Sequence, residues 1–149
     1  MLNSKQVYLK SFAQLSKTEL YAILALRVQI FCVEQNCPYQ DLDGQDQDAR
    51  HVFIKTAAEI GAYARIIDEN ENTAHIGRVV VNERFRRKGL AKVIMNACIM
   101  TVRQGQAREI EVSAQSYLND FYQELGFKNT GKYYLEDDIP HAQMRLSLA

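Results

Sequence analysis

A run of β-branched residues passes directly into a basic segment containing glycine, and this junction constrains the fold more than any other part of the sequence. The run is Val79, Val80 and Val81, and the segment that follows is RFRRKGLA, residues 84–91. Apolar residues then recur at three- and four-residue intervals, which is the pattern of an amphipathic helix. The sequence therefore predicts a strand, a short loop and a helix that ends at Gly105.

The start of this helix is a predicted anion-binding site. The first amides of a helix have no hydrogen-bond partner and lie at the positive end of its dipole, so they attract phosphate oxygens. Arg86, Arg87 and Lys88 add positive charge, and Gly89 lets the backbone approach a ligand closely. Nucleoside triphosphate loops need GxxxxGK[ST] and dinucleotide folds need GxGxxG, and neither motif occurs. We therefore expect the diphosphate of another kind of ligand.

The composition is that of one globular domain. The chain has 149 residues, of which 47% are apolar and 24% are charged, so we expect a single domain over residues 1–149. Its 18 acidic and 18 basic residues balance, so no summed charge attracts nucleic acid or a membrane surface. The basic run at residues 84–88 is short and offers only Phe85 for base stacking. We therefore expect no nucleic-acid partner and no membrane partner.

The cysteines and histidines favour a cytoplasmic protein without a metal. Cys32, Cys37 and Cys98 are odd in number and lack the CxxC pairing of a zinc ribbon, so reduced thiols are expected. The N-terminus lacks the apolar core of a signal peptide, and no apolar stretch approaches the roughly 18 residues that span a bilayer. The three histidines do not have the spacing of a metal-ligand motif.

The N-terminal half predicts a strand, a helix and an acidic loop. Residues 7–9 can begin a strand, and Ser16 with Glu19 has the spacing of a capping box at a helix start. Apolar residues at helical spacing follow, with Arg27 near the end of the stripe. Residues 36–50 are rich in acidic residues and contain proline and glycine, so we expect a functional loop there.

The remaining residues predict a meander, a crossover and a closing pair of strands. Segments rich in β-branched residues predict three antiparallel strands and then a fourth that runs parallel to the third, because a helix connects them. A short helix is expected at residues 117–125, and a loop at residues 136–140. The expected strands are 51–55, 60–67, 75–81, 109–113, 127–134 and 143–148.

Two segments resemble signatures of one enzyme family. The spacing of Arg86, Gly89 and Ala91 resembles the R/Q-x-x-G-x-G/A signature of the GNAT superfamily of N-acetyltransferases, and NDFYQELGF at 119–127 resembles its second signature. The segments LRVQIFCVEQNCPYQDLDGQDQDARH and EDDIPHAQM look like the ElaA subgroup. The resemblance covers nearly the whole chain. It implies a mixed α/β GNAT fold, in which about four helices flank a twisted, mostly antiparallel sheet with one splayed parallel pair.

The resemblance implies acetyl-CoA as a co-substrate. In the superfamily, amides of the splayed strand hold the pantetheine arm and the thioester carbonyl, and amides of the glycine-containing loop hold the diphosphate. Many members also bind the arm through an asparagine, for which this chain offers Gln115 or Asn119. The residues thus implied to bind the coenzyme are Val79, Val80, Val81, Arg86, Arg87, Lys88, Gly89, Leu90, Ala91, Gln115 and Asn119.

Transfer of an acetyl group to an amine needs an acid and a base. By its position in FYxxxGF, Tyr122 is the implied general acid for the departing thiolate, and an ordinary pKa of about 10 keeps it protonated at neutral pH. The acceptor ammonium must lose a proton before the amine attacks. The candidate bases in or beside the acidic loop are Glu34, Asp41, Asp43, Asp46 and His51, and of these we expect Glu34, after the first helix, to take the proton. A packed tyrosine and a solvated glutamate are the alternatives to these roles.

The acceptor is expected to be a small-molecule or protein amine. Acidic residues in and beside the 36–50 loop favour a cationic acceptor. We expect Arg27, Asp43, His51 and Arg65 to bind it, and for the charged residues a structural ion pair is the alternative. Members of the superfamily are often dimers, so the resemblance also implies a homodimer.

Two other functions remain open. The pattern of Arg27, Phe31, Asp43, Asp46 and Arg65 also resembles acyl-homoserine-lactone synthases, which combine an acyl donor with S-adenosylmethionine. A non-catalytic acyl-CoA-binding module would share the diphosphate loop without turnover. Tight binding of coenzyme A would argue against the first function, and turnover of amines against the second.

Overall fold

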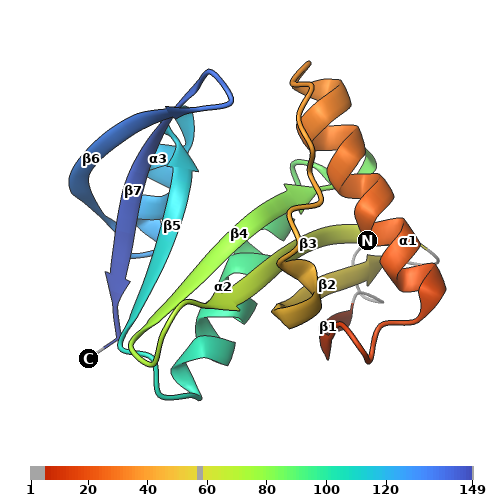
Figure 1. The fold of residues 1–149 in the computed structure, drawn as a ribbon, viewed down its shortest axis with the longest axis horizontal. Helices are drawn as coiled ribbons and strands as arrows, with labels where there is room; N and C mark the ends of the chain where they lie inside the picture. Colours follow the sequence, from red (N-terminus) through yellow and green to blue (C-terminus); the bar gives the residue numbers. More distant parts are fainter. Residues whose placement is uncertain (1–5, 57–58, 149) are drawn as a thin grey trace.

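One sheet of seven strands organises the chain, as the computed structural model of residues 6–56 and 59–148 shows (Figure 1). The strand order is β1-β2-β3-β4-β5-β7-β6. Within the described residues, three α-helices, one π-helical segment and three short 3-10 turns connect the strands. The elements are β1 (Gln6–Ser11), α1 (Lys17–Arg27), η1 (Val28–Glu34), η2 (Asp46–Asp48), β2 (Arg50–Thr56), β3 (Glu59–Asp68), β4 (Thr73–Val81), η3 (Glu83–Phe85), α2 (Leu90–Arg103), β5 (Glu109–Gln115), η4 (Ser116–Leu118), α3 (Asn119–Glu124), β6 (Lys128–Glu136) and β7 (Ile139–Ser147).

Helix α1 begins with the predicted capping box and ends in an unusual way. The Glu19 amide donates to the Ser16 hydroxyl at 3.0 Å, and the Glu19 carboxylate accepts from the Ser16 amide at 2.9 Å. The helix then passes without a break into the π-helical segment η1. Such segments are rare and are often found at functional sites. Here η1 carries the chain to Glu34 and the start of the acidic loop.

The parallel pair of strands is short, and the sheet opens beyond it. Strands β1 to β4 pair antiparallel in sequence, which confirms the predicted meander. Strands β4 and β5 then pair in parallel at only three positions, from Thr73 opposite Glu109 to His75 opposite Glu111. Both strands continue for several residues after the last of these pairs. The two halves of the sheet therefore separate into a V, as Figure 1 shows.

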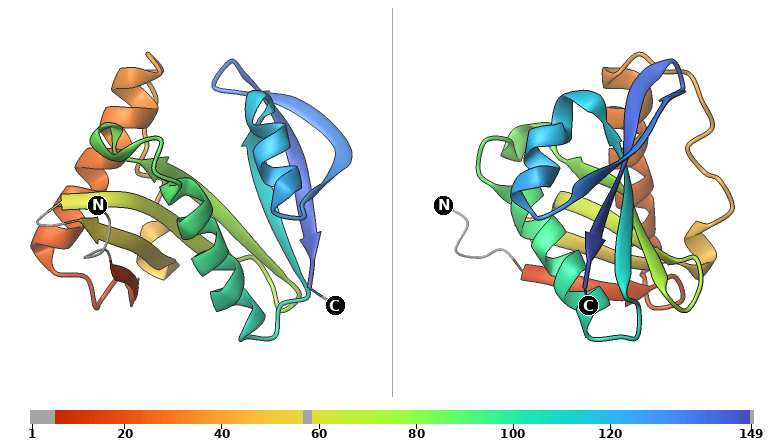
Figure 2. Two further views of the ribbon diagram at one scale, coloured as in Figure 1. Left: turned by 180° about the vertical axis from the view of Figure 1, so that it is seen from behind. Right: turned by 90° about the vertical axis from the view of Figure 1, so that its left-hand side faces the viewer.

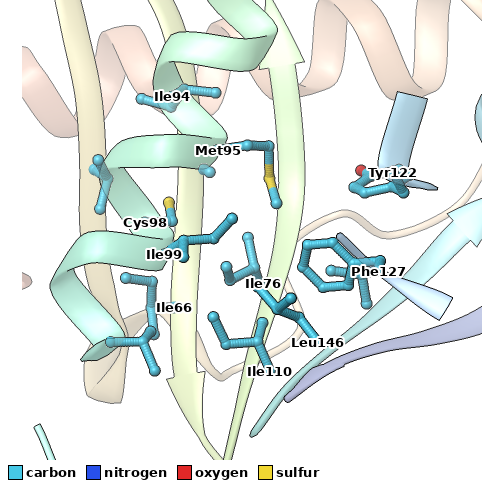
Figure 3. Close-up of a cluster of buried hydrophobic side chains, with 14 of the residues drawn as sticks. Ile66, Ile76, Ile94, Met95, Cys98, Ile99, Ile110, Tyr122, Phe127 and Leu146 are labelled. Carbon is cyan, nitrogen blue, oxygen red and sulfur yellow. The ribbon is translucent and has the colours of Figure 1, made fainter. Parts of the chain in front are cut away.

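Helix α2 covers one face of the sheet and makes the main core. Its buried side chains include Ile94, Met95 and Cys98, which are all fully buried and pack against strand residues such as Ile76 and Ile110 (Figure 3). The other face carries a second, smaller core beneath α1. The two helices thus lie on opposite faces of the β1–β4 half, as the two views of Figure 2 agree. Because α2 is packed along its length, its first turn is held firmly beside the end of β4.

The C-terminal hairpin is tighter than the sequence predicts. The expected loop at residues 136–140 is a two-residue turn, because β6 extends to Glu136 and β7 begins at Ile139. Asp137 and Asp138 make this turn with φ values of 52° and 63°. Aspartate tolerates positive φ in such turns, and this preference explains how the strands continue so far. The short helix predicted at 117–125 is also divided, into η4 and α3.

Candidate functional site

A cleft of about 520 Å³ lies where β4 and β5 separate. Its walls come from the second half of β4, the start of α2, the end of β5, segment η1 and the β6–β7 turn. Lys88 and Asn119 lie outside the described lining. The predicted coenzyme and catalytic residues that line it are Glu34, Val79, Val80, Val81, Arg86, Arg87, Gly89, Leu90, Ala91, Gln115 and Tyr122.

The backbone before α2 turns sharply to expose the first amides of the helix. Arg87 has a φ of 64° and Gly89 has a φ of 75°, both in the left-handed region. A Cβ at Gly89 would meet no atom within 4 Å, so this glycine serves backbone conformation rather than packing. Because the first turn of a helix has no internal partners for its amides, an anion in the cleft would find free N–H donors there.

Strand β4 presents an unpaired edge to the same cleft. After His75 it has no β5 partner, while its other edge continues to pair with β3 as far as Val81. The β3–β4 register shifts between Tyr63 and Arg65, and Arg78 lies at this irregularity with a φ of 53°. A bulge turns backbone groups out of the ladder. The edge around Val79 can therefore offer backbone donors to a bound group.

Tyr122 lies deep in the cleft on α3 and is 6% exposed. Its ring packs edge-on against Phe121 and Phe127, with ring centroids 5.1 Å and 5.8 Å away. Burial raises the pKa of its hydroxyl to about 12. A phenol in this environment keeps its proton at neutral pH, so it is present in the form that can act as a general acid toward a departing thiolate.

Glu34 and Arg86 form an ion pair within the lining of the cleft. One Arg86 guanidinium nitrogen lies 2.7 Å and 2.9 Å from the two Glu34 carboxylate oxygens. Both side chains are more than one third exposed, so the pair contributes little to stability. Its geometry is more informative, because the candidate base and a candidate diphosphate ligand are bound to each other.

The two candidates for the pantetheine contact differ in position. Gln115 ends β5, lines the cleft and donates from its side-chain amide to Gln35 at 3.4 Å. The Asn119 side chain instead accepts a hydrogen bond of 2.8 Å from Asn129. The geometry therefore favours Gln115 over Asn119.

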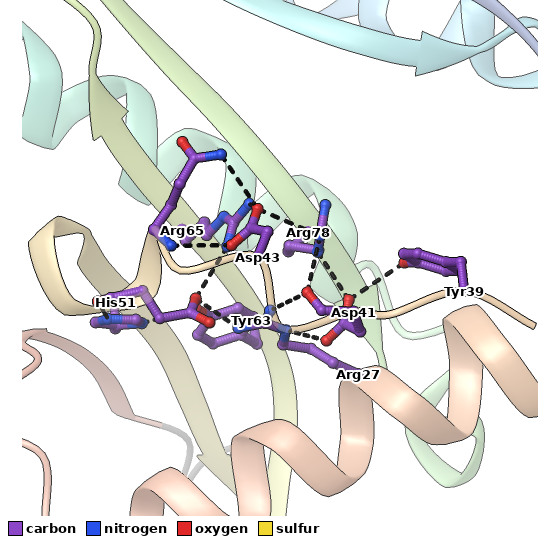
Figure 4. Close-up of polar contacts among 10 residues, drawn as sticks. Arg27, Tyr39, Asp41, Asp43, His51, Tyr63, Arg65 and Arg78 are labelled. Atoms are coloured by element: carbon purple, nitrogen blue, oxygen red, sulfur yellow. Dashed lines mark hydrogen bonds and ion pairs between the residues drawn. The ribbon is translucent and has the colours of Figure 1, made fainter. Parts of the chain in front are cut away.

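A network of ion pairs holds the acidic loop against the sheet (Figure 4). Its centre is Arg27, which is 0% exposed and donates to Asp41 at 2.8 Å and to Asp46 at 2.7 Å. Arg65 pairs with both Asp43 and Asp46. Burying the charges of Arg27, Asp41, Asp46 and Arg65 is favourable only because each one is paired and hydrogen-bonded. The network thus fixes the path of residues 41–46.

The network also reaches the irregular part of β4. The Arg78 guanidinium donates to the Asp41 carboxylate at 2.8 Å and to the Asp41 carbonyl at 3.0 Å. Tyr39 lies beside it, with its hydroxyl 3.2 Å from the same carboxylate. Arg78 was not among the predicted site residues, since one arginine within a strand gives no local sequence signal.

Arg27 and His51 line neither described hollow. His51 is 1% exposed, and its ring nitrogens lie 2.7 Å from the Tyr63 hydroxyl and 2.9 Å from the Asp46 carbonyl. Burial lowers the pKa of His51, so its ring is neutral at neutral pH. These positions favour a structural role over direct contact with an acceptor.

Asp43 and Arg65 line a second hollow of about 410 Å³. It lies next to the cleft, and four residues line both: Tyr39, Arg78, Glu136 and Asp137. Glu136, at the end of β6, and Asp137, in the β6–β7 turn, were not among the predicted site residues, because this hairpin approaches β4 only in the folded chain.

The comparisons with known proteins agree with this geometry. Residues 23–148 match the family model described as an acetyltransferase (GNAT) domain. The chain belongs to the GNAT acetyltransferase family. Protein ElaA of Escherichia coli is 40% identical to this chain, and the match covers 89% of this chain and 90% of ElaA. A UPF0039 protein of Schizosaccharomyces pombe is 39% identical, and the match covers 99% of this chain and 100% of that protein.

Solved structures of GNAT relatives superpose closely. An acyl-CoA N-acyltransferase from Pseudomonas aeruginosa has a TM-score of 0.91 at 38% identity, covering 97% of this chain and 100% of its own. The E. coli ElaA structure has a TM-score of 0.89 at 36% identity, covering 96% and 99%. These matches confirm the expected fold and the ElaA-like character of the chain. Among the described residues, no helix has the length and apolar character needed to cross a bilayer.

Two more distant structures share the fold alone. A GNAT acetyltransferase from Elizabethkingia anophelis, solved with acetyl-CoA bound, has a TM-score of 0.68 at 11% identity and covers 97% of this chain and 99% of its own. The AHL synthase LasI has a TM-score of 0.81 at 13% identity and covers 97% and 90%.

The ion-pair network predicts an acid-sensitive stability. Hydrogen bonding by Arg65 lowers the pKa of Asp43. Burial acts to raise the pKa of Asp46, but the hydrogen bonds and charges of Arg27 and Arg65 outweigh burial, so the pKa of Asp46 is also lowered. Both pKa values therefore lie below the unfolded value of about 3.9, so their stabilisation is present above that pH and is lost as the pH falls through the folded values. Asp46→Asn should lower the free energy of unfolding at pH 7 by about 3 kcal/mol.

Urea unfolding over a series of pH values measures this effect. Asp46→Asn should also reduce the steepness with which stability falls below about pH 5. Asp48→Asn is the matched control, because Asp48 is an exposed residue of the same short turn. Equal pH dependence in Asp46→Asn and the unmodified chain would contradict the expected role of the network.

Proposed function

We propose that this GNAT protein transfers an acetyl group from acetyl-CoA to the amine of a small molecule or protein. The observation that carries the proposal is the single cleft that joins the unpaired start of α2, the free edge of β4 and the buried Tyr122 hydroxyl. A diphosphate bound at the start of α2 would direct the pantetheine arm of the coenzyme along the free edge of β4. The structure with acetyl-CoA bound in the GNAT relative from E. anophelis supports this choice of donor.

The reaction would proceed by direct attack on the thioester. The amine nitrogen bonds to the carbonyl carbon, and the negative charge that develops on oxygen is stabilised by backbone amides near Val79, each typically contributing about 3 kcal/mol. The acceptor ammonium first loses one proton, to Glu34 directly or through water, and the neutral amine then attacks. As the carbon–sulfur bond breaks, the thiolate takes the proton of the Tyr122 hydroxyl, and the acetylated nitrogen gives up its second proton, which restores the hydroxyl directly or through water.

In this mechanism the Glu34–Arg86 ion pair must open when the coenzyme binds. Arg86 can bind a diphosphate fully only when its guanidinium turns from Glu34, which lies 2.7 Å away. The same movement would free the Glu34 carboxylate to accept a proton. We therefore assign Arg86 to the diphosphate, Glu34 to the base and Gln115 to the pantetheine arm. The second hollow, with Asp43, Arg65, Glu136 and Asp137 in its lining, is the proposed acceptor site.

A thiol-release assay with acetyl-CoA over a panel of amines, together with calorimetry of coenzyme A binding, tests the proposal. We expect saturable binding of coenzyme A and thiol release that depends on at least one amine. Failure to bind coenzyme A would overturn the assignment of the donor and favour an activity like that of the AHL synthases, whose fold this chain shares. Binding without turnover over the whole panel would instead favour a non-catalytic acyl-CoA-binding module.

Replacing Tyr122 tests the acid. Tyr122→Phe should lower kcat by about 10²-fold while the KM for acetyl-CoA changes little, because the hydroxyl is needed for the thiolate and not for binding. Tyr133→Phe is the matched control, since Tyr133 is 66% exposed on β6 and lies outside the described lining. Steady-state kinetics of both variants give the answer, and an unchanged kcat in Tyr122→Phe would remove the acid role.

Replacing Glu34 separates a base from a partner of Arg86. If Glu34 is the base, Glu34→Gln should lower kcat by about 10²-fold and remove the acidic limb of the pH–rate profile. The matched control is Glu59→Gln, which breaks the comparable Glu59–Arg84 pair of 2.8 Å outside the described lining. Tighter coenzyme A binding with an unchanged kcat and pH profile would contradict the base role and leave Glu34 only as the partner of Arg86.

A further inference from the structure

Three side chains of metal-binding type meet beside the second hollow. They are Glu69, His75 and Glu111, and one ligand atom from each lies within 4.8 Å of the others. Ala74 and Ile76 pack into the core beneath α2, so His75 points from the opposite face of the sheet. Glu69 and His75 are among the residues that line the second hollow.

The backbone fixes these three residues relative to one another. His75 and Glu111 are direct partners in the parallel β4–β5 ladder, at the last pair before the strands separate. Glu69 follows the end of β3, and its amide donates to the Thr73 carbonyl at 3.0 Å, which closes the β3–β4 turn. Ligands on strands, such as His75 and Glu111, are held more firmly than ligands on a loop.

His75 has an imidazole nitrogen without a partner. Its Nδ1 is buried and makes no hydrogen bond within the described residues. A buried polar atom of this kind calls for a bound water or ion. A neutral imidazole nitrogen is the form of histidine that binds a metal.

The carboxylate of Glu111 is oriented by its neighbours. The Gln143 amide donates to one of its oxygens at 2.8 Å, and the Arg145 guanidinium lies 3.3 Å from the other. The Gln143 side chain in turn accepts a hydrogen bond of 2.8 Å from the Thr130 hydroxyl. Such outer hydrogen bonds are typical around the carboxylate ligands of metal sites, where they fix the position of the ligand.

We propose that Glu69, His75 and Glu111 bind a divalent transition-metal ion, with Zn²⁺ as the best match. One imidazole nitrogen and two carboxylate oxygens are ligands that Zn²⁺ accepts, and three protein ligands leave a fourth position open. Ligand atoms around tetrahedral Zn²⁺ lie about 3.4 Å apart, so small side-chain movements from separations within 4.8 Å complete the site. The open position would face the second hollow.

Calorimetric titration of untagged, chelator-treated protein with ZnCl₂ tests this site. The expected result is one Zn²⁺ per chain, with an affinity that falls by about ten-fold or more in His75→Gln and in Glu111→Gln. Glu109→Gln is the matched control, because Glu109 also lies on β5 and pairs with Arg145, at 3.2 Å, but is not one of the three ligands. The Glu109→Gln variant should bind Zn²⁺ with the same affinity as the unmodified chain. Thermal unfolding of each variant without metal verifies that it is folded.

Two results would overturn the proposal. One is the absence of Zn²⁺ binding by the unmodified chain, and the other is binding that His75→Gln leaves unchanged, as expected if Zn²⁺ binds to cysteine thiolates such as that of the half-buried Cys32. A raised KM for the amine in His75→Gln without any metal binding would assign the cluster to acceptor recognition instead. The titration needs no acetyl transfer, so its result is independent of the proposed function.

Discussion

The three paired positions between β4 and β5 are the constraint on which the rest of the structure depends. Parallel pairing begins at Thr73 and ends at His75, so the sheet is continuous at one end and open at the other. Helix α2 must connect these strands, and its packing on the β4 side places its unpaired amides at the opening. The same separation admits Tyr122 from α3 and the β6–β7 turn to the cleft. One short ladder therefore creates both the space and the groups that surround it.

The buried ion pairs serve the shape of the cleft more than its chemistry. Replacing buried pairs by apolar residues is often neutral or stabilising in other proteins, so their presence is weak evidence for stability alone. Here the network connects α1 through Arg27 and Asp41 to Arg78, which has an unusual positive φ. It ties the acidic loop to the irregular part of β4. A polar network is therefore suited to fixing one backbone conformation beside the cleft.

The sequence predicts the features that short segments encode, but it does not predict contacts between residues that lie far apart along the chain. The strand–loop–helix junction at Gly89, the helix start at Ser16 and the place of Tyr122 all follow from short segments, and the structure brings the first and last of these to one cleft. The role of the acidic loop could not be predicted in this way, because a charged residue that contacts a ligand and one that forms an interior ion pair look the same in the local sequence. Arg27 lies in such pairs because Asp41 and Asp46 fold back over it. Likewise, Glu69, His75 and Glu111 come together only through strand pairing.

The ion pair between Glu34 and Arg86 has a consequence for the order of events. The two residues are 52 positions apart in sequence and join the end of η1 to the loop before α2. An anion that draws Arg86 away leaves the Glu34 carboxylate without its ion-pair partner. If Glu34 is the base, as proposed, it would become available only after the coenzyme has entered. That order would favour sequential addition, with the coenzyme first and the amine second.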